Sequence, residues 1–245
     1  GGSLTFFAYS YNKKDMTVGD NFGFACVWAL GEDGQYQGGI TGHFDVATNK
    51  NVDFLVADIA ADKTENENNY AHTGVPTLFR HKLSMVNVAA NLAEDYANKK
   101  FILNSVKFTN LYHYATYSQI PEMMAPGGND FLPDQVYAEN VGFEVKSGGL
   151  IAVPAEIKKG AGVEDGQYIY IPQEFNDNSY IVITYTVETV VGNNVVKEEC
   201  TKTVKVKDVF PKWEMGHRYT FNLTFSLNEI HWDPAVENWI DDEAG

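Results

Sequence analysis

Ten consecutive residues near the end of the chain alternate between apolar and polar side chains. Residues 219–228 place Tyr219, Phe221, Leu223, Phe225 and Leu227 on one side and threonine, asparagine and serine on the other. An alternation with a period of two is typical of a β-strand with one buried and one solvated face. We therefore predict that these five side chains face the core of a sheet protein whose last domain is closed by its own C-terminal strands.

Most other apolar segments also have the length of strands and lie between turn-forming residues. Two of them flank Gly192-Asn193-Asn194, which is a strong hairpin signal. Residues 79–91 fit a strand that runs into a helical turn within 89–97, and the polar residues 62–69 fit an exposed loop. The remaining predicted strands are residues 4–11, 22–30, 52–60, 101–109, 111–118, 141–146, 150–155, 167–172, 179–191 and 195–207. Many strands with short turns and few helices indicate β-sandwiches rather than βαβ units.

The best candidate for a domain boundary is the segment 120–134, which holds three prolines and two glycines and shows no alternation. A chain of 245 residues is long enough for two domains, and its hydrophobic content of 44% is sufficient for real cores. We predict an all-β protein with two tandem β-sandwich domains, residues 1–120 and residues 131–245.

The charge of the chain argues against two classes of partner. There are 33 acidic residues against 18 basic ones, for a formal net charge of −15, and the only arginines are Arg80 and Arg218. Nucleic acid and anionic membrane surfaces both attract basic patches, so we expect neither as a partner. No apolar run has the roughly 18 residues needed to span a bilayer, and no signal peptide is recognisable.

No pattern in the sequence indicates catalysis or a cofactor. The six histidines, at positions 43, 72, 81, 113, 217 and 231, lack the close spacing of zinc ligands, and His81 is interpreted as a packed structural residue. Residues 62–67 are rich in oxygen ligands but lack the calcium-loop pattern. Nucleophile-elbow, P-loop and dinucleotide-binding motifs are missing. We predict a protein that is not an enzyme, with no catalytic residues, no metal site and no cofactor.

A few side chains leave alternatives open. Cys26 and Cys200 are far apart in the sequence, so they are either two separate small apolar residues or a disulfide. Asn222 begins a glycosylation triplet, but the triplet lies inside the terminal strand. Some aromatic residues are either sugar-stacking platforms or parts of the sandwich cores, with burial favoured; they are Trp28, Tyr36, Tyr112, Tyr114 and Tyr117.

Several segments, taken in order, resemble the fimbrillin family, the FimA- and Mfa-like fimbrial subunit proteins of Gram-negative anaerobes. The residues 79–88, Phe-Arg-His-Lys-Leu-Ser-Met-Val-Asn-Val, are similar to a strand of that family with the pattern Phe-x-His-x-Leu-Ser. The other segments are residues 4–9, 53–57, 170–173 with 181–185, 213–219 and 230–239. Together they cover nearly the whole chain.

This resemblance implies a fold and a function. The fold is two β-sandwich domains of the transthyretin-like, Greek-key type. The function is that of an exported lipoprotein at the outer membrane and cell surface, whose partners are other fimbrial subunits bound by strand donation, with host or bacterial glycans or proteins as further adhesion targets. Such assembly is β-augmentation, in which a donated strand completes an open sheet edge.

In the family, the strand at residues 4–8 normally follows several other strands and a lipid-bearing cysteine. Here only Gly1-Gly2-Ser3 precede it, so we expect the first sandwich to be incomplete at its N-terminus. The alternative function from another class is a secreted or surface carbohydrate-binding module. That module would need an exposed aromatic patch or polar cleft, whereas a fimbrial subunit would need an apolar groove along a strand edge.

Overall fold

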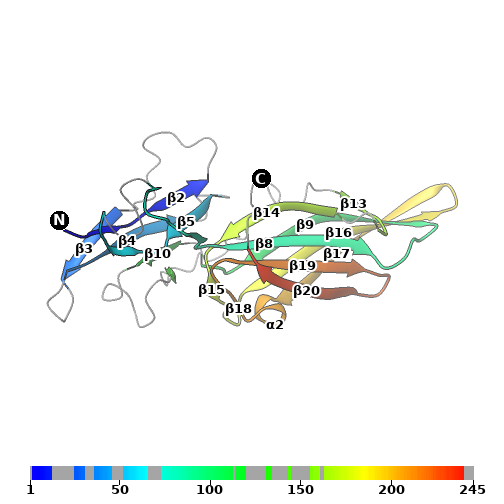
Figure 1. The fold of residues 1–245 in the computed structure, drawn as a ribbon. Coiled ribbons are helices and arrows are strands. Elements are labelled where there is room, and N and C mark those ends of the chain that lie inside the picture. Colours follow the sequence, from blue (N-terminus) through cyan, green and yellow to red (C-terminus); the bar gives the residue numbers. More distant parts are fainter. Residues whose placement is uncertain are drawn as a thin grey trace.

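The computed structural model describes residues 2–12, 25–30, 36–45, 52–65, 73–112, 114–119, 131–133, 143–144, 155–160 and 163–239. It is built almost entirely of strands, which form two groups along the long axis of the molecule (Figure 1). The predicted all-β sandwich class is therefore confirmed.

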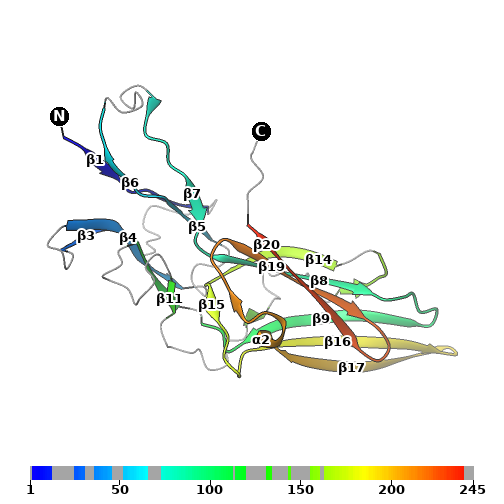
Figure 2. The ribbon, with the colours of Figure 1, turned by 60° about the horizontal axis from the view of Figure 1, so that its bottom comes forward.

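The group that contains the C-terminus is a sandwich of two sheets. The first sheet has the order β14 (Val163–Tyr170), β8 (Ser84–Leu92), β19 (His217–Phe225) and β20 (Ile230–Asn238). The second has the order β12 (Phe143–Glu144), β9 (Lys99–Thr109), β16 (Tyr180–Val191) and β17 (Asn194–Lys205), and β13 (Ala155–Ile157) also pairs with β9. Strands β8 and β19 pair in parallel. The pairs β14–β8, β19–β20 and β9–β16 are antiparallel. Figure 2 shows the two sheets as separate layers.

Strand β19 forms because its apolar side chains alternate, as predicted. Tyr219, Phe221, Leu223 and Phe225 are buried, and the residues between them are half-buried. The ring of Phe221 lies 5.4 Å from that of Phe108 on β9, so the alternating face of β19 packs against the opposite sheet. The prediction is wrong for Leu227, which is 53% exposed. The strand ends at Phe225, because Ser226 and Glu229 close a turn by backbone and side-chain hydrogen bonds.

The predicted hairpin is also present. Val191 on β16 pairs with Asn194 on β17, which leaves Gly192 and Asn193 as a two-residue loop. Gly192 has φ +60°, a conformation that glycine adopts without the clash of a Cβ atom. A positive φ at the first loop residue is the pattern of a type II′ turn, whose twist matches that of paired strands.

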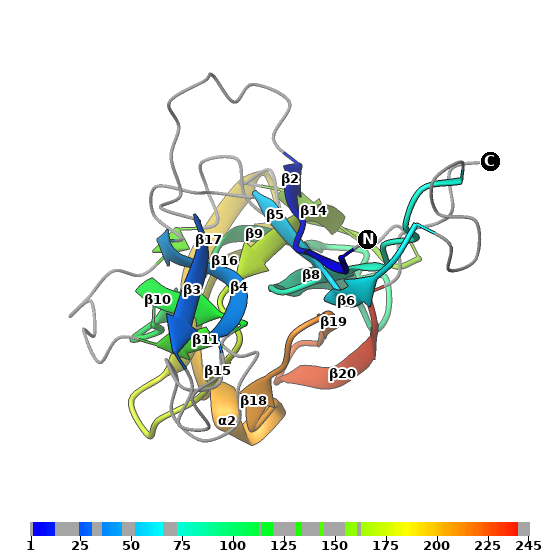
Figure 3. The ribbon, with the colours of Figure 1, turned by 60° about the vertical axis from the view of Figure 1, so that its left-hand side comes forward.

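The second group of strands contains the N-terminus. One sheet has the order β11 (Phe131–Pro133), β10 (Tyr114–Ser118), β4 (Tyr36–Asp45) and β3 (Ala25–Leu30). Another has the order β2 (Tyr9–Asn12), β5 (Asp53–Ala57) and β7 (Phe79–His81), and β1 (Leu4–Phe6) pairs with β6 (Ala60–Lys63). Figure 3 looks at this group from its free end, with β3, β4, β10 and β11 on one side and β2 and β5 on the other. Phe54 and Tyr117 meet edge to face, with ring centroids 5.4 Å apart, and join the two sheets.

Two local predictions in the first half of the chain differ from the structure. Residues 4–11 form two short strands, because the chain leaves one pairing at Phe6 and begins another at Tyr9. The helical turn expected within residues 89–97 is absent there, since β8 continues to Leu92 and is followed by bends and a turn. Alanine and asparagine in this segment lie between β14 and β19, and pairing on both sides outweighs their helix propensity.

The chain passes between the two groups more than once. After β7 it enters the C-terminal sandwich with β8 and β9, returns to the N-terminal group with β10 and β11, and then re-enters the sandwich. The pairing of β8 and β9 thus groups residues 84–109 with the C-terminal strands, whereas the expected boundary at 120–134 would assign them to the first domain. That boundary lies mostly outside the described residues, and the division into two domains stays a prediction.

Candidate functional site

Three features of the molecule are candidates for a function. They are a junction between the two strand groups and two surfaces with exposed apolar side chains. The junction centres on His81, at the end of β7. Its Nδ1 atom lies 3.0 Å and 2.9 Å from the two carboxylate oxygens of Asp53 on β5, and both side chains are more than nine-tenths buried. The imidazole also stacks on Trp239, just after β20. The interpretation of His81 as a packed, hydrogen-bonded structural residue is therefore confirmed.

Backbone contacts hold the same junction. The amide of Trp239 donates to the carbonyl of Gly216, and the amide of Gly216 donates to the carbonyl of Leu83. Gly216 has φ +67°, and a Cβ atom placed on it would lie 3.4 Å from the carbonyl oxygen of His81. The turn before β19 therefore approaches the segment between β7 and β8 closely. These contacts hold the turn before β19 and the end of β20 against the segment that leads from β7 to β8.

Arg80, the residue before His81, is exposed and not packed in the junction. Arg80 points to solvent and binds Asp58 through three hydrogen bonds of 2.8–3.1 Å, with both side chains about half exposed. Hydrogen bonding to the guanidinium lowers the pKa of Asp58 below its usual value. An exposed pair of this kind contributes little to stability.

Two glutamine side chains bridge strands by bonding to backbone groups. Gln173 on β15 (Gln173–Glu174) accepts from the amide of Tyr112 and donates to its carbonyl, at 2.8 Å and 3.1 Å. Gln119, just after β10, accepts from the amide of Ile40 and donates to the carbonyl of Ala57. The hydrogen bonds of Gln173 anchor the segment after β9, in which the chain returns to the N-terminal group. Those of Gln119 join the two N-terminal sheets. No pattern in the sequence predicts either bridge, because Gln173 lies on a strand of two residues and Gln119 just after the strand β10, where no periodicity can be recognised.

The first exposed apolar surface lies on the N-terminal strands. Leu4 and Phe6 on β1 are 64% and 40% exposed, although a strand that pairs on both edges and packs on both faces would bury them. Among the described residues, β1 pairs with β6 alone. We call this set the N-terminal apolar surface; its members are Leu4, Phe6, Tyr9, Ile59, Leu78 and Phe79.

The second exposed apolar surface is the tip of the β16–β17 hairpin. Its members are Val190, Val191, Val195 and Val196, each about half exposed. This hairpin extends past the other strands at the end of the molecule opposite the N-terminus (Figure 1). Strand alternation and the pairing of Val190 with Val195 place these two valines on one face of the tip, and Val191 and Val196 on the other. The tip therefore exposes two valines on each face.

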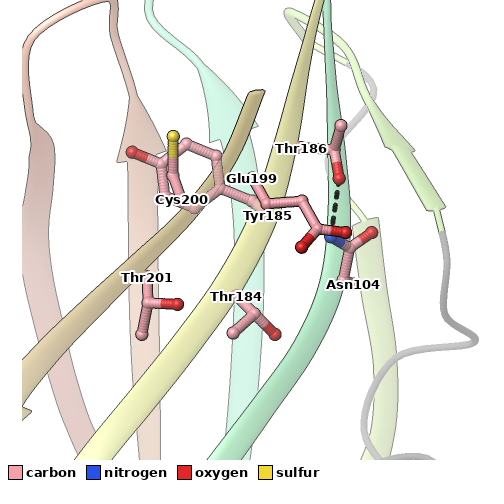
Figure 4. A pocket seen from close by; sticks show the side chains of 7 residues that line it. All are labelled: Asn104, Thr184, Tyr185, Thr186, Glu199, Cys200 and Thr201. Carbon is pink, nitrogen blue, oxygen red and sulfur yellow. Dashed lines mark hydrogen bonds between the residues drawn. The ribbon is translucent and has the colours of Figure 1, made fainter. Parts of the chain in front are cut away.

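Two hollows lie on the surface of the described residues; the first is lined mostly by polar groups, and the second by apolar and charged side chains together. One, of about 430 Å³, lies over β9, β16 and β17 (Figure 4), and another, of about 390 Å³, lies near the hairpin tip around Tyr96 and Lys99. In the first, Asn104 donates a hydrogen bond of 2.8 Å to Thr186, and the carboxylate of Glu199 lies beside this pair. Neither hollow is the apolar groove expected of a strand acceptor.

The aromatic residues proposed as sugar platforms are not exposed where the structure describes them. Tyr117 is fully buried and Tyr112 is half-buried. The side chains of Trp28, Tyr36 and Tyr114 lie outside the described residues. Cys200 is a free thiol on β17, and Asn222 bonds through its side-chain amide to the carbonyl of Asp233.

Within the described ranges, no three histidine, cysteine or acidic side chains gather as metal ligands. In the same part of the chain, no helix has the length and apolar character that a membrane span requires.

Comparison with known proteins decides the family. Residues 1–239 match the sequence profile of the fimbrillin-like family. This chain belongs to that family. No curated protein matches it.

Solved structures show the same fold. A fimbrial protein from Bacteroides vulgatus is 17% identical with a TM-score of 0.67, and the alignment covers 95% of this chain and 77% of that one. A candidate cell adhesion protein from Bacteroides uniformis is 15% identical with a TM-score of 0.53, and the alignment covers 98% of this chain and 74% of that one. This fimbrillin-like chain therefore shares its architecture with a fimbrial protein.

Proposed function

We propose that this chain is a non-enzymatic fimbrial subunit at the cell surface, which joins other fimbrial subunits by β-strand exchange. Family membership supports the fimbrial role, and the exposed N-terminal strand supports the mode of assembly. The observation that carries the second part is β1, whose leucine and phenylalanine are exposed and which pairs with one neighbour among the described strands.

The physical reason is that such a strand is unfavourable in an isolated subunit. Unpaired backbone groups and apolar side chains at a sheet edge favour the addition of another strand. A strand supplied by a neighbouring subunit would satisfy those groups by main-chain hydrogen bonds and cover alternate side chains. The N-terminal apolar surface supplies the side chains for that contact.

The subunit role is tested on cells that carry the chain's own gene. Immunogold electron microscopy with antibodies against the chain should label filaments at the cell surface. Label confined to the cell body, with filaments unlabelled, contradicts the fimbrial role.

The strand-exchange role is tested by substitution in the same cells. Leu4→Ser combined with Phe6→Ser should shorten or abolish the labelled filaments, because it removes the apolar side chains that a partner strand would cover. Leu227→Ser is the matched control, since Leu227 is equally exposed but lies in the turn after β19. Filaments of normal length in the double variant contradict strand exchange at β1 and leave the subunit role intact.

A carbohydrate-binding module, the alternative function, requires an exposed aromatic patch or a polar cleft. The described residues offer a mostly polar hollow over β9, β16 and β17 but no support for the aromatic patch. Of the five candidate aromatics, the two whose side chains are described are buried or half-buried. Binding of the chain to a glycan array would be the observation that favours this function.

A further inference from the structure

The edge of the C-terminal sandwich that β17 forms offers a contact different from strand exchange at β1. Strand β17 is the last strand of its sheet, and among the described residues no strand pairs with its outer side. Figure 2 shows it at the margin of the sandwich, beyond β16. It has 12 residues, contains no proline or glycine, and is exposed over most of its length. Such a long regular edge is what proteins usually avoid leaving open.

The corresponding edge of the other sheet is protected. Strand β20 carries Pro234, which has no N–H to donate, and a proline on an edge strand is a common device against the addition of another strand. Both edge strands carry charged side chains, but every residue of β17 has an N–H, so its backbone can pair with a further strand along its outer side. A strand that binds to β17 must therefore match its charges.

The backbone of β17 fixes which residues are available on that edge. The pair Val191–Asn194 closes a two-residue loop, so it is a hydrogen-bonded pair, and such pairs alternate along an antiparallel ladder. The even-numbered residues from Asn194 to Val204 therefore direct their N–H and C=O groups to β16. The odd-numbered residues, among them Glu199 and Thr201, direct theirs outward.

A second copy of β17 fits this edge in one register. We propose that two copies of this chain associate side by side through antiparallel pairing of β17 with β17, centred on Cys200. This places outward-directed Glu199 opposite outward-directed Thr201 of the other copy, as the hydrogen bonds require. It also places Glu198 opposite Lys202 and Val196 opposite Val204, so that opposite charges pair and valines pair.

The neighbouring registers that satisfy the same backbone rule all oppose like charges. A shift of two positions places Glu199 against Glu199 in one direction and Lys197 against Lys205 in the other. A shift of four places Glu198 against Glu198 or Lys202 against Lys202. Like charges directly opposite each other destabilise a strand pair, so the register centred on Cys200 is selected.

The charge of β17 also favours contact between two copies of this strand over contact between other parts of the two molecules. The strand carries three lysines and two glutamates, whereas the chain as a whole has a net charge of −15. Two strongly acidic molecules repel each other least where the local charge is nearly balanced. The occupant that matches the edge in both backbone direction and side-chain charge is a second copy of this chain. This association is independent of strand exchange at β1.

Charge reversal tests the register. In the full chain, Glu198→Lys alone should weaken self-association, measured by analytical ultracentrifugation, by about tenfold, because like charges then oppose each other twice in each pair of chains. Lys202→Glu alone should do the same. The double variant Glu198→Lys with Lys202→Glu should restore wild-type association. A chain that stays monomeric up to about 1 mM, or a double variant no better than the single ones, overturns the proposal.

Cross-linking tests the centre of the pairing. Cys200 faces its symmetry mate at a position where the two strands exchange no hydrogen bonds, and there the Cα atoms lie about 4.5 Å apart, within the range of a disulfide. A Cys26→Ser variant, which keeps Cys200 as its only thiol, should give a covalent dimer when oxidised with copper phenanthroline. The variant that also carries Cys200→Ser should give none. A Cys26→Ser chain that remains monomeric under the same oxidation contradicts the register.

Discussion

The imidazole of His81 stacks on the indole of Trp239, with ring centroids 3.9 Å apart and planes 13° from parallel. The two residues come from the two strand groups, and the carboxylate of Asp53 binds the edge of the imidazole through Nδ1. A residue near the end of the chain thus completes a cluster built around β5 and β7. This contact makes the C-terminal strand part of the junction between the groups.

Removing the imidazole should therefore destabilise the fold. We expect His81→Ala to lower the free energy of unfolding by about 2–4 kcal/mol, because Asp53 would keep a buried carboxylate without that partner. Arg80→Ala is the matched control on the neighbouring residue, with an expected loss below about 1 kcal/mol, since its ion pair is exposed. Urea denaturation measures both, and equal losses would contradict the assigned role of the junction.

The register of β19 predicts a contrast between adjacent residues. Phe221 is buried among Phe108, Phe210 and Trp213, so Phe221→Ala should cost about 3–5 kcal/mol of unfolding free energy. Thr220→Ala, on the opposite face, should cost little, as should Leu227→Ala in the exposed turn. Chemical denaturation tests the series. Comparable losses for Phe221 and Thr220 would rule out the register.

The bridge from Gln173 to Tyr112 should be needed for stability. Gln173→Leu leaves the amide and the carbonyl of Tyr112 without the bonds that the side chain supplied, and each such group costs about 1–3 kcal/mol when buried. We expect a total loss of about 2–4 kcal/mol. Glu174→Leu, one residue further and exposed, serves as the control in thermal unfolding. A melting temperature unchanged in the Gln173 variant would show that the bridge is dispensable.

From the buried phenol of Tyr170 we predict how the stability of the fold changes at alkaline pH. Its complete burial, and secondarily the neighbouring Tyr168, raise the pKa of its phenol well above the ordinary value of 10.0. At a pH above the ordinary value, the unfolded chain loses this proton while the folded chain keeps it. The contribution of Tyr170 to stability is thus complete below pH 10 and decreases as the pH rises further.

The variant Tyr170→Phe should therefore show a smaller loss of stability between about pH 9 and pH 11 than the wild type. Urea titrations at the two pH values give the comparison. An identical pH dependence in both proteins would mean that Tyr170 is not the group that titrates.

The alternation in the sequence predicted strands well where one face is buried and the other is half-buried. Strand β19 and the β16–β17 hairpin are examples, because alternation and a glycine turn are local signals. The prediction was wrong at Leu227, where a tight turn ends the strand although the alternation continues. It was also wrong within residues 89–97, where pairing on both edges of β8 outweighs local helix propensity.

The candidate surfaces could be predicted only in part. His81 was identified from its neighbours, but its partners Asp53 and Trp239 lie 28 and 158 positions away, and no periodicity indicates such contacts. The open edge of β17 depends on strand order, which a single sequence does not determine. Once that order is known, the charges along residues 194–205 determine the register of the proposed pair.

The repeated passage of the chain between its two strand groups has a mechanical consequence. Because β8 and β9 belong to one group while β7 and β10 belong to the other, at least three covalent segments join the two groups. A tensile load applied to the N-terminal group would act together on the short segment between β7 and β8 and on the His81–Trp239 contact. Extension of the molecule at this junction therefore requires both to give way, which makes it stiffer than a junction made by a single linker.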